Sequence, residues 1–291
     1  MSRRLIITAD DYGLCEPANA AIEECLEAGA MHATCVMTNM PDYRAVAALR
    51  HRFPGASLGI HWTLSLGRPV LPPQQVPSLV GPGGEFLHWA ELRRRVLARK
   101  IDFAQVRAEL YAQVERFRET AGEPDFWNTH QNVHVAPGLF QTCVGLAHEL
   151  GITTMRSHRR ITVPQQGGAL GYNLRHPLYW LKAQLIGRWT DRAEALGMRT
   201  PDGIIYTPGF GQGRTAVEAV AERLPWRNVR QAAEWVIHPA TTTDHPLFGR
   251  LTESRLREYE VFRDPELKER LAGRGVMCVG FEVLRPHLQP A

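Results

Sequence analysis

The chain has 291 residues, of which 44% are hydrophobic and 22% charged, values that are typical of a globular protein and exclude a disordered or collagen-like one. The formal net charge is only +4, and the basic clusters at 93–95 and 156–160 come without a recognition motif, so we expect no nucleic-acid partner. No apolar run approaches the ~18 residues of a membrane span, and no signal-peptide pattern opens the sequence, which predicts a cytoplasmic location.

The first half of the sequence alternates short apolar runs with helical periodicity. The apolar runs predict strands at 5–9, 33–37, 58–64 and 126–129. Three- and four-residue spacing of apolar side chains predicts helices at 16–29, 43–51, 102–120 and 139–150. Pro and Gly crowd the stretch 67–84, so we expect a long surface loop beside the site, an insertion near residues 67–90.

The same alternation continues in the second half. Strands are predicted at 152–155, 203–207, 234–237 and 276–283, and helices at 178–196, 217–224 and 253–271. Between them, residues 157–200 form a second insertion with an irregular beginning. Its aromatic residues fit either a sugar-stacking surface or the core; they are Tyr172, Tyr179, Trp180, Trp189 and, just beyond it, Tyr206.

Alternating strands and helices predict a parallel sheet in an α/β fold. The length allows a single domain over residues 1–291, either a (β/α) barrel or a doubly wound open sheet. No GxGxxG follows the first strand, which weakens the dinucleotide-binding alternative.

The cysteines are five and scattered, with no CxxC pair, so neither a disulfide framework nor a structural zinc site is expected. Three lie in apolar surroundings and are predicted to be core residues: Cys35, Cys143 and Cys278.

The most unusual polar residues fall at the carboxyl ends of predicted strands. In a parallel barrel these ends converge on one face, where the site is built. Side chains far apart in the sequence are therefore expected to meet there: Asp10, Asp11, His61, His130 and His238.

Each of these residues also has a structural alternative. Asp10 and Asp11 fit a turn before a helix cap, or a base beside a metal ligand, because successive residues at a strand end point in different directions. His61 fits a satisfied core histidine or a ligand. His238 precedes Pro239, which keeps the chain extended, and suits either a structural role or a general acid near neutral pH.

The segment 128–134 (NTHQNVH) is the densest polar cluster of the sequence. Its HxxxH pair could bind one metal ion from a single helical face. Pro137 and Gly138 follow closely, however, and make a long helix doubtful. We therefore favour His130 alone as a ligand, with His134 supporting it or facing the substrate.

Four segments carry a family resemblance. The first is TADDYGL at 8–14, similar to N-A-D-D-[FY]-G-L, and the second is GIHWTL followed by GRP at 59–69, similar to G-x-H-x-x-L and G-x-P. The third is THQNVH at 129–134, similar to D-S-H-x-H-V-H. The fourth is IHP at 237–239 with RE at 257–258, similar to HPG and R-E. In this order the chain resembles the YdjC-like carbohydrate deacetylases, which include chitooligosaccharide deacetylases and the hopanoid-biosynthesis-associated deacetylase group.

The resemblance implies a TIM-barrel variant with mostly parallel strands, and hydrolysis of an N-acetyl group on a sugar by metal-activated water. By matching position, Asp11, His61 and His130 would hold one divalent ion, either magnesium or zinc. Asp10 would be the catalytic base and His238 the acid.

Substrate contacts are expected from His134, Asn132, Arg68 and Trp62. The sequence departs from the family pattern at Asn128, where many members have Asp, at Asn132, which replaces a histidine, and at Ala240, which replaces a glycine. An amide at 128 does not polarise a neighbouring histidine as a carboxylate does.

Two other functions fit the same residues. A metal-dependent phosphoesterase would commonly hold two ions ~3.5–4 Å apart, whereas only one ligand set stands out here. A non-catalytic carbohydrate-binding protein would use the same scaffold without turnover. A homodimer is expected only from the general frequency of such assemblies.

Overall fold

The computed structural model describes residues 3–163, 177–207 and 213–285. Within them, all paired strands run parallel in the order β4-β3-β2-β1-β7-β6-β5, and β8 lies beside the first half of β1. The strands are β1 Arg3–Tyr12, β2 Ala33–Val36, β3 Ser57–Trp62, β4 Trp127–Thr129, β5 Arg160–Thr162, β6 Gly203–Tyr206, β7 Ala233–Ile237 and β8 Val276–Val279. The predicted α/β class with a parallel sheet is confirmed.

The two edges of this sheet approach each other. The Trp127 N–H of β4 donates to the Thr154 carbonyl at 3.0 Å, and the Met155 N–H donates to the Arg199 carbonyl at 2.9 Å. These bonds belong to isolated parallel bridges that connect β4 to the segments leading into β5 and β6. The sheet is therefore curled toward a ring, which confirms the barrel-like prediction.

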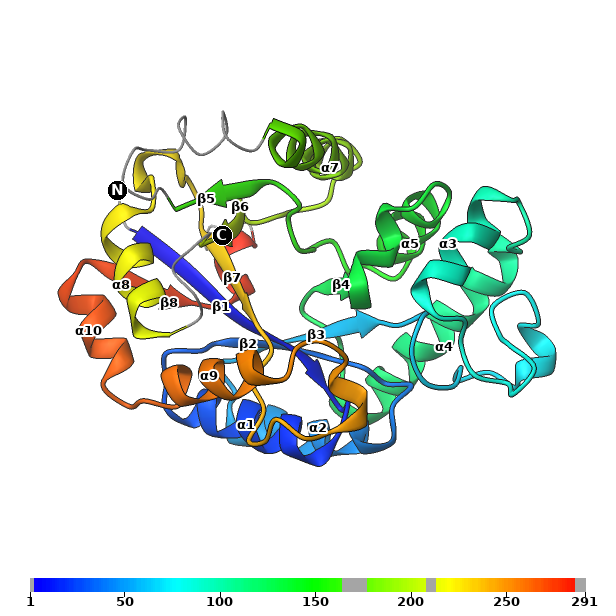
Figure 1. Cartoon of the computed structure of the whole chain (residues 1–291), viewed down its shortest axis with the longest axis horizontal. Coiled ribbons are helices and arrows are strands. Elements are labelled where there is room, and N and C mark those ends of the chain that lie inside the picture. The colour runs from blue at the N-terminus through cyan, green and yellow to red at the C-terminus, as the bar shows by residue number, and fades with distance from the viewer. Residues whose placement is uncertain (1–2, 164–176, 208–212, 286–291) are drawn as a thin grey trace, which may run out of the picture.

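Helices surround the curled sheet (Figure 1), with α1 beside α9, and α4 between α2 and α5. Their bounds are α1 Glu16–Glu27, α2 Val46–Arg52, α3 Trp89–Leu97, α4 Phe103–Ala121, α5 Leu139–Glu149, α7 Pro177–Ala195, α8 Arg214–Arg223, α9 Glu253–Phe262 and α10 Leu267–Gly273. Short 3-10 helices are η1 Pro41–Ala45, η2 Pro73–Gln75, η3 His130–Val135, η4 Trp226–Asn228, η5 Pro246–Phe248 and η6 Phe281–Leu284.

Strand β1 shows how the core is divided. Leu5, Ile7 and Ala9 belong to the large apolar cluster between the sheet and the helices. Ile6 belongs to a separate inner cluster with Cys35, Phe126 and Phe281. Because side chains alternate along a strand, the inner face continues through Thr8 to Asp10 and turns polar toward the carboxyl end. The apolar floor and the polar site thus occupy the two ends of the same interior.

Three predicted boundaries are wrong. The expected strand at 152–155 forms only isolated bridges, and the paired strand β5 lies further along. The expected helix at 253–271 is divided into α9 and α10, because Pro265 lacks the N–H that a continuous helix needs. The expected strand at 276–283 ends at Val279 and continues as η6.

The first predicted insertion is an irregular segment packed on α4. The backbone N–H groups of Val70 and Leu71 donate to the buried Glu109 carboxylate at 2.9 and 3.0 Å. In the second insertion Trp189 packs against Phe140, and Trp180 is 45% exposed, whereas Tyr172 lies outside the described residues. Among the described helices, none combines the length and the apolar composition needed to cross a membrane.

Candidate functional site

Strand ends bring the polar residues together at one end of the ring. Asp10 and Asp11 end β1, His61 lies near the end of β3, and His130 and His238 directly follow β4 and β7. Each of the three histidines has a ring nitrogen within 4 Å of a carboxylate oxygen of one aspartate.

The backbone at the end of β1 separates the two aspartates. The β1–β2 register shifts between Ala9 and Tyr12, and Asp11 has φ +72° in the left-handed region, which a side chain adopts at a cost. Gly13 completes the turn with φ +93°, where a Cβ would lie 2.9 Å from the Tyr43 Cα. The two carboxylates consequently face different partners, although they are adjacent in sequence.

Asp11 faces two histidines. Its Oδ1 lies 3.3 Å from His61 Nε2 and 3.2 Å from His130 Nδ1, and the three ligand atoms lie within 4.8 Å of one another. Burial raises the pKa of Asp11, but hydrogen bonds from His130 and His61 and the charge of Arg255 hold it well below its ordinary value. Two imidazoles and one ionised carboxylate are a donor set that fits a divalent ion with open positions.

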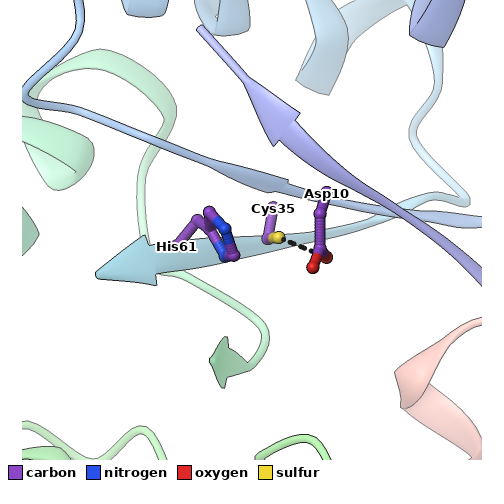
Figure 2. Close-up of side chains that lie close together, drawn as sticks. All are labelled: Asp10, Cys35 and His61. Carbon is purple, nitrogen blue, oxygen red and sulfur yellow. Dashed lines mark hydrogen bonds between the residues drawn. The ribbon is translucent and has the colours of Figure 1, made fainter. Parts of the chain in front are cut away.

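Asp10 faces an arginine. Arg156 donates to Oδ2 at 2.6 Å and to Oδ1 at 2.7 Å, forming a bidentate pair in which both side chains are buried. The Cys35 thiol also donates to Oδ1 at 3.1 Å, as Figure 2 shows. Burial raises the pKa of Asp10, yet the charges of Arg156 and His61 lower it below its ordinary value, so this carboxylate is ionised at neutral pH.

Asn128 connects the two groups. Its amide donates to Asp10 Oδ1 at 3.2 Å, which leaves its carbonyl oxygen to accept from His61 Nδ1 at 2.5 Å. When His61 loses its Nε2 proton, the remaining proton is held on Nδ1 by Asn128, which leaves the lone pair of the neutral ring on Nε2, the atom that faces Asp11. The amide at 128 therefore orients this histidine without a carboxylate, and it adds no negative charge beside Asp10.

One more carboxylate, Glu234, and a second arginine, Arg255, complete the charge arrangement. Arg156 donates to the fully buried Glu234 at 3.0 Å, so one guanidinium is shared by Glu234 and Asp10. Arg255 donates to Asp11 Oδ2 at 2.6 Å. Each aspartate of the pair thus has its own buried arginine.

His238 follows β7, which lies on the other side of β1 from β3 and β4 in the strand order of the sheet. Its Nε2 is 3.8 Å from Asp10 Oδ2. The imidazole is 29% exposed, more than the other site histidines that pair with the aspartates. Burial lowers its pKa, partly opposed by the charges of Asp11 and Asp10. Its backbone N–H donates to Glu258, whose pKa is raised to about 7 by burial.

Comparison with known proteins identifies the family. The model of the family described as YdjC-like protein matches residues 4–273. The chain belongs to the YdjC-like family.

Named relatives cover nearly the whole of this YdjC-like chain. A human carbohydrate deacetylase is 30% identical, with 97% of this chain and 91% of the relative covered. A chitooligosaccharide deacetylase of Yersinia pestis is 27% identical, with 97% of this chain and 99% of the relative covered. A solved structure from Enterococcus faecalis V583, of a protein to which cellobiose-phosphate cleavage has been ascribed, superposes on this chain with a TM-score of 0.74 at 23% identity. The superposition covers 98% of this chain and 99% of that one, which supports the fold.

The predicted substrate-contacting residues occupy different surroundings. Trp62 and His134 are fully buried: the indole N–H donates to the Leu110 carbonyl, and the imidazole lies against His158 and Thr129. In this structure neither presents a surface to a substrate, because both are enclosed by the core. Their predicted contact therefore disagrees with their location.

The other two predicted contacts are exposed. Asn132 follows Gln131 in η3, both with positive φ, so the segment after His130 is a kinked turn and not a helical HxxxH face. Arg68 lies in the Pro-rich segment, where its guanidinium donates to the Gly83 carbonyl at 3.0 Å.

Sequence reasoning missed the charged partners of the aspartates. Arg156 was interpreted only as part of a basic cluster, and Arg255 and Glu234 were not singled out. A charged residue inside the apolar strand 233–237 is a signal that could have indicated Glu234. The core prediction for Cys35 is correct for burial but incomplete, since its thiol contacts Asp10.

Proposed function

We propose that this protein is a metal-dependent hydrolase that removes an N-acetyl group from a sugar or glycoconjugate. The observation that carries the proposal is a single site in which a ligand set, an ionised carboxylate held by arginine, and a partly exposed imidazole lie side by side. The deacetylase names of the human and Yersinia relatives support the same reaction.

The ligand set would be Asp11, His61 and His130, and it would hold one divalent ion, magnesium or zinc. Such an ion, when bound, lowers the pKa of a water molecule and polarises the acetyl oxygen. Asn128 contributes by keeping the lone pair of His61 on Nε2, and Arg255 holds the second oxygen of Asp11.

Asp10 would accept the proton of the attacking water. Its ionised state is secured by Arg156, which also fixes the orientation of the carboxylate. The lowered pKa makes Asp10 a weak base, so it is suited to accept a proton briefly and to pass it on. The neighbouring His238 Nε2, 3.8 Å from Asp10 Oδ2, is the natural next carrier.

His238 would protonate the departing amine, which cannot leave a sugar as an anion. Its lowered pKa makes the protonated ring a stronger acid, and its exposure gives it access to the substrate. General acid–base assistance of this kind contributes ~10²–10⁴-fold per group. Asn132 and Arg68, both exposed, are the residues we propose to contact the sugar.

The test is acetate release from a panel of N-acetylated sugars, chitooligosaccharides included, by chelated enzyme with and without added magnesium or zinc. We expect release only after metal is restored, and none from the Asp10→Asn variant. Absence of acetate from every panel member, in protein shown to contain one ion per chain, would contradict the proposal. A phosphoester panel assayed in parallel would then identify the competing reaction.

A further inference from the structure

A second group of metal-binding side chains lies beside the first. Figure 2 shows Asp10, Cys35 and His61 on the neighbouring strands β1, β2 and β3, with their polar ends converging. Each offers a ligand atom, and these atoms lie within 4.8 Å of one another. We propose that the three residues form a binding site for a thiophilic divalent ion such as Zn²⁺ or Cd²⁺, and that occupancy of this site inhibits the enzyme.

The thiol determines which ions the site would select. Thiolate is a soft ligand that favours zinc and similar ions, whereas magnesium favours oxygen ligands. Binding replaces the proton that now lies between Cys35 Sγ and Asp10 Oδ1: the S–H bond breaks, a metal–sulfur bond forms, and the proton leaves to solvent without any oxidation or reduction.

The sulfur–oxygen distance requires a small adjustment, and the hydrogen bonds of Asp10 Oδ1 must rearrange. In a tetrahedral zinc site, with Zn–S of ~2.3 Å and Zn–O of ~2.1 Å, the sulfur and oxygen lie about 3.6 Å apart. The present distance from Cys35 Sγ to Asp10 Oδ1 is 3.1 Å. Opening this pair by ~0.5 Å is within the reach of side-chain rotation. Asp10 Oδ1 also accepts from Arg156 at 2.7 Å and from Asn128 at 3.2 Å, so an ion on Oδ1 would displace these two donors, whereas the Arg156 bond to Oδ2 would remain.

Inhibition follows from the shared histidine. His61 belongs both to this group and to the group of Asp11 and His130. A neutral imidazole has one nitrogen lone pair, so the ring binds one ion at a time. An ion on Cys35 therefore removes His61 from the proposed catalytic ligand set and occupies the proposed base Asp10. This inhibitory consequence rests on the proposed function, whereas the binding itself does not.

The binding test needs no substrate. Metal-free full-length protein is titrated with Cd²⁺, and the ultraviolet thiolate-to-cadmium charge-transfer band and the cadmium retained per chain are measured. We expect the wild type to develop the band. The variants Cys35→Ser and Cys35→Ala should lack it and bind Cd²⁺ at least ~10-fold more weakly, since loss of even a supporting partner costs 10–100-fold in metal affinity. Circular dichroism confirms that each variant is folded.

Two matched variants locate the ion. Cys143→Ala removes a buried cysteine remote from the cluster and should keep the band. His130→Ala disables the other ligand set and should also keep it. A band that persists in Cys35→Ser, or cadmium that binds the wild type without a band, would overturn the proposal.

An activity measurement then separates the two proposals. If the enzyme releases acetate, Cd²⁺ should inhibit the wild type and inhibit Cys35→Ser at least ~10-fold more weakly. If no acetate is released but the band appears and depends on Cys35, the deacetylase proposal fails and the metal site stands.

Discussion

The two halves of the ring contribute opposite chemistry to the site. Strands β1 and β3 and the residue that follows β4 carry the carboxylate and imidazole groups of the proposed ligand set. The later half contributes two guanidinium groups and a partly exposed imidazole: Arg156, Arg255 and His238. Ligands come from one half and compensating positive charge from the other.

This division explains how two adjacent carboxylates remain ionised in a buried place. Burial and mutual repulsion both disfavour the charged forms of Asp10 and Asp11. At Asp10 the charge of Arg156 reverses that effect on the pKa. At Asp11 the hydrogen bonds of His130 and His61 do so together with the charge of Arg255. Changes in the first half should therefore affect metal binding, and changes in the second half should affect turnover and stability.

The largest effect is expected from the first half. His61→Ala and His130→Ala should each lose the bound ion and reduce turnover by at least ~10³-fold, because a ligand that also positions the reaction is removed. Metal content per chain after dialysis checks the prediction, with the exposed His51→Ala as the control. Full metal content in either variant would remove that histidine from the ligand set.

In the second half, Arg156→Met should destabilise the protein by ~3–5 kcal/mol, since it leaves Asp10 and Glu234 buried without their cation. Urea unfolding measures the change. The surface variant Arg159→Met, whose partners are Asp191 and Glu194, should cost less than ~1 kcal/mol. Equal losses in the two variants would contradict a buried charge network.

A pH dependence is expected from Glu258, whose pKa is raised to about 7 by burial. A carboxyl group whose pKa is raised by folding contributes stability that is fully present below its pKa in the unfolded state, ~4.5. This contribution is lost as the pH rises through its pKa in the folded state. As the pH rises from 4.5 to 8, the free energy of unfolding of Glu258→Gln should therefore increase relative to that of the wild type, by up to ~3 kcal/mol. Metal-free urea unfolding at several pH values tests this, and the exposed Glu260→Gln should show no such gain.

The smallest effect is expected at the rim. Asn132 has φ +53°, so Asn132→Gly should relieve backbone strain and raise stability by at most ~1 kcal/mol. If its amide contacts the sugar, KM should rise while kcat changes little. Arg99 has a similar positive φ, +56°, and lies far from the site residues in sequence, so Arg99→Gly should raise stability without a kinetic effect. An unchanged KM in Asn132→Gly would exclude the contact.

The first half of the site could be predicted because strand ends in a parallel barrel converge. Asp10, Asp11, His61 and His130 each follow or end an apolar run, and this pattern is visible in the sequence. The left-handed conformation of Asp11 could not be foreseen, because it depends on the register shift between β1 and β2.

The second half could not be predicted to the same extent, for a physical reason. Arg156 pairs with Asp10 across 146 residues, and it follows a segment that lacks a regular strand. Arg255 reaches Asp11 from a helix across 244 residues. Neither arginine differs in local pattern from the many arginines on the surface, so only the folded ring reveals its partner.

The most direct test of the division compares the adjacent aspartates. Metal content per chain is measured for Asp10→Asn and Asp11→Asn, purified and dialysed together. We expect Asp10→Asn to retain one ion and lose turnover, and Asp11→Asn to lose the ion. Equal retention or equal loss in the two variants would contradict this expectation.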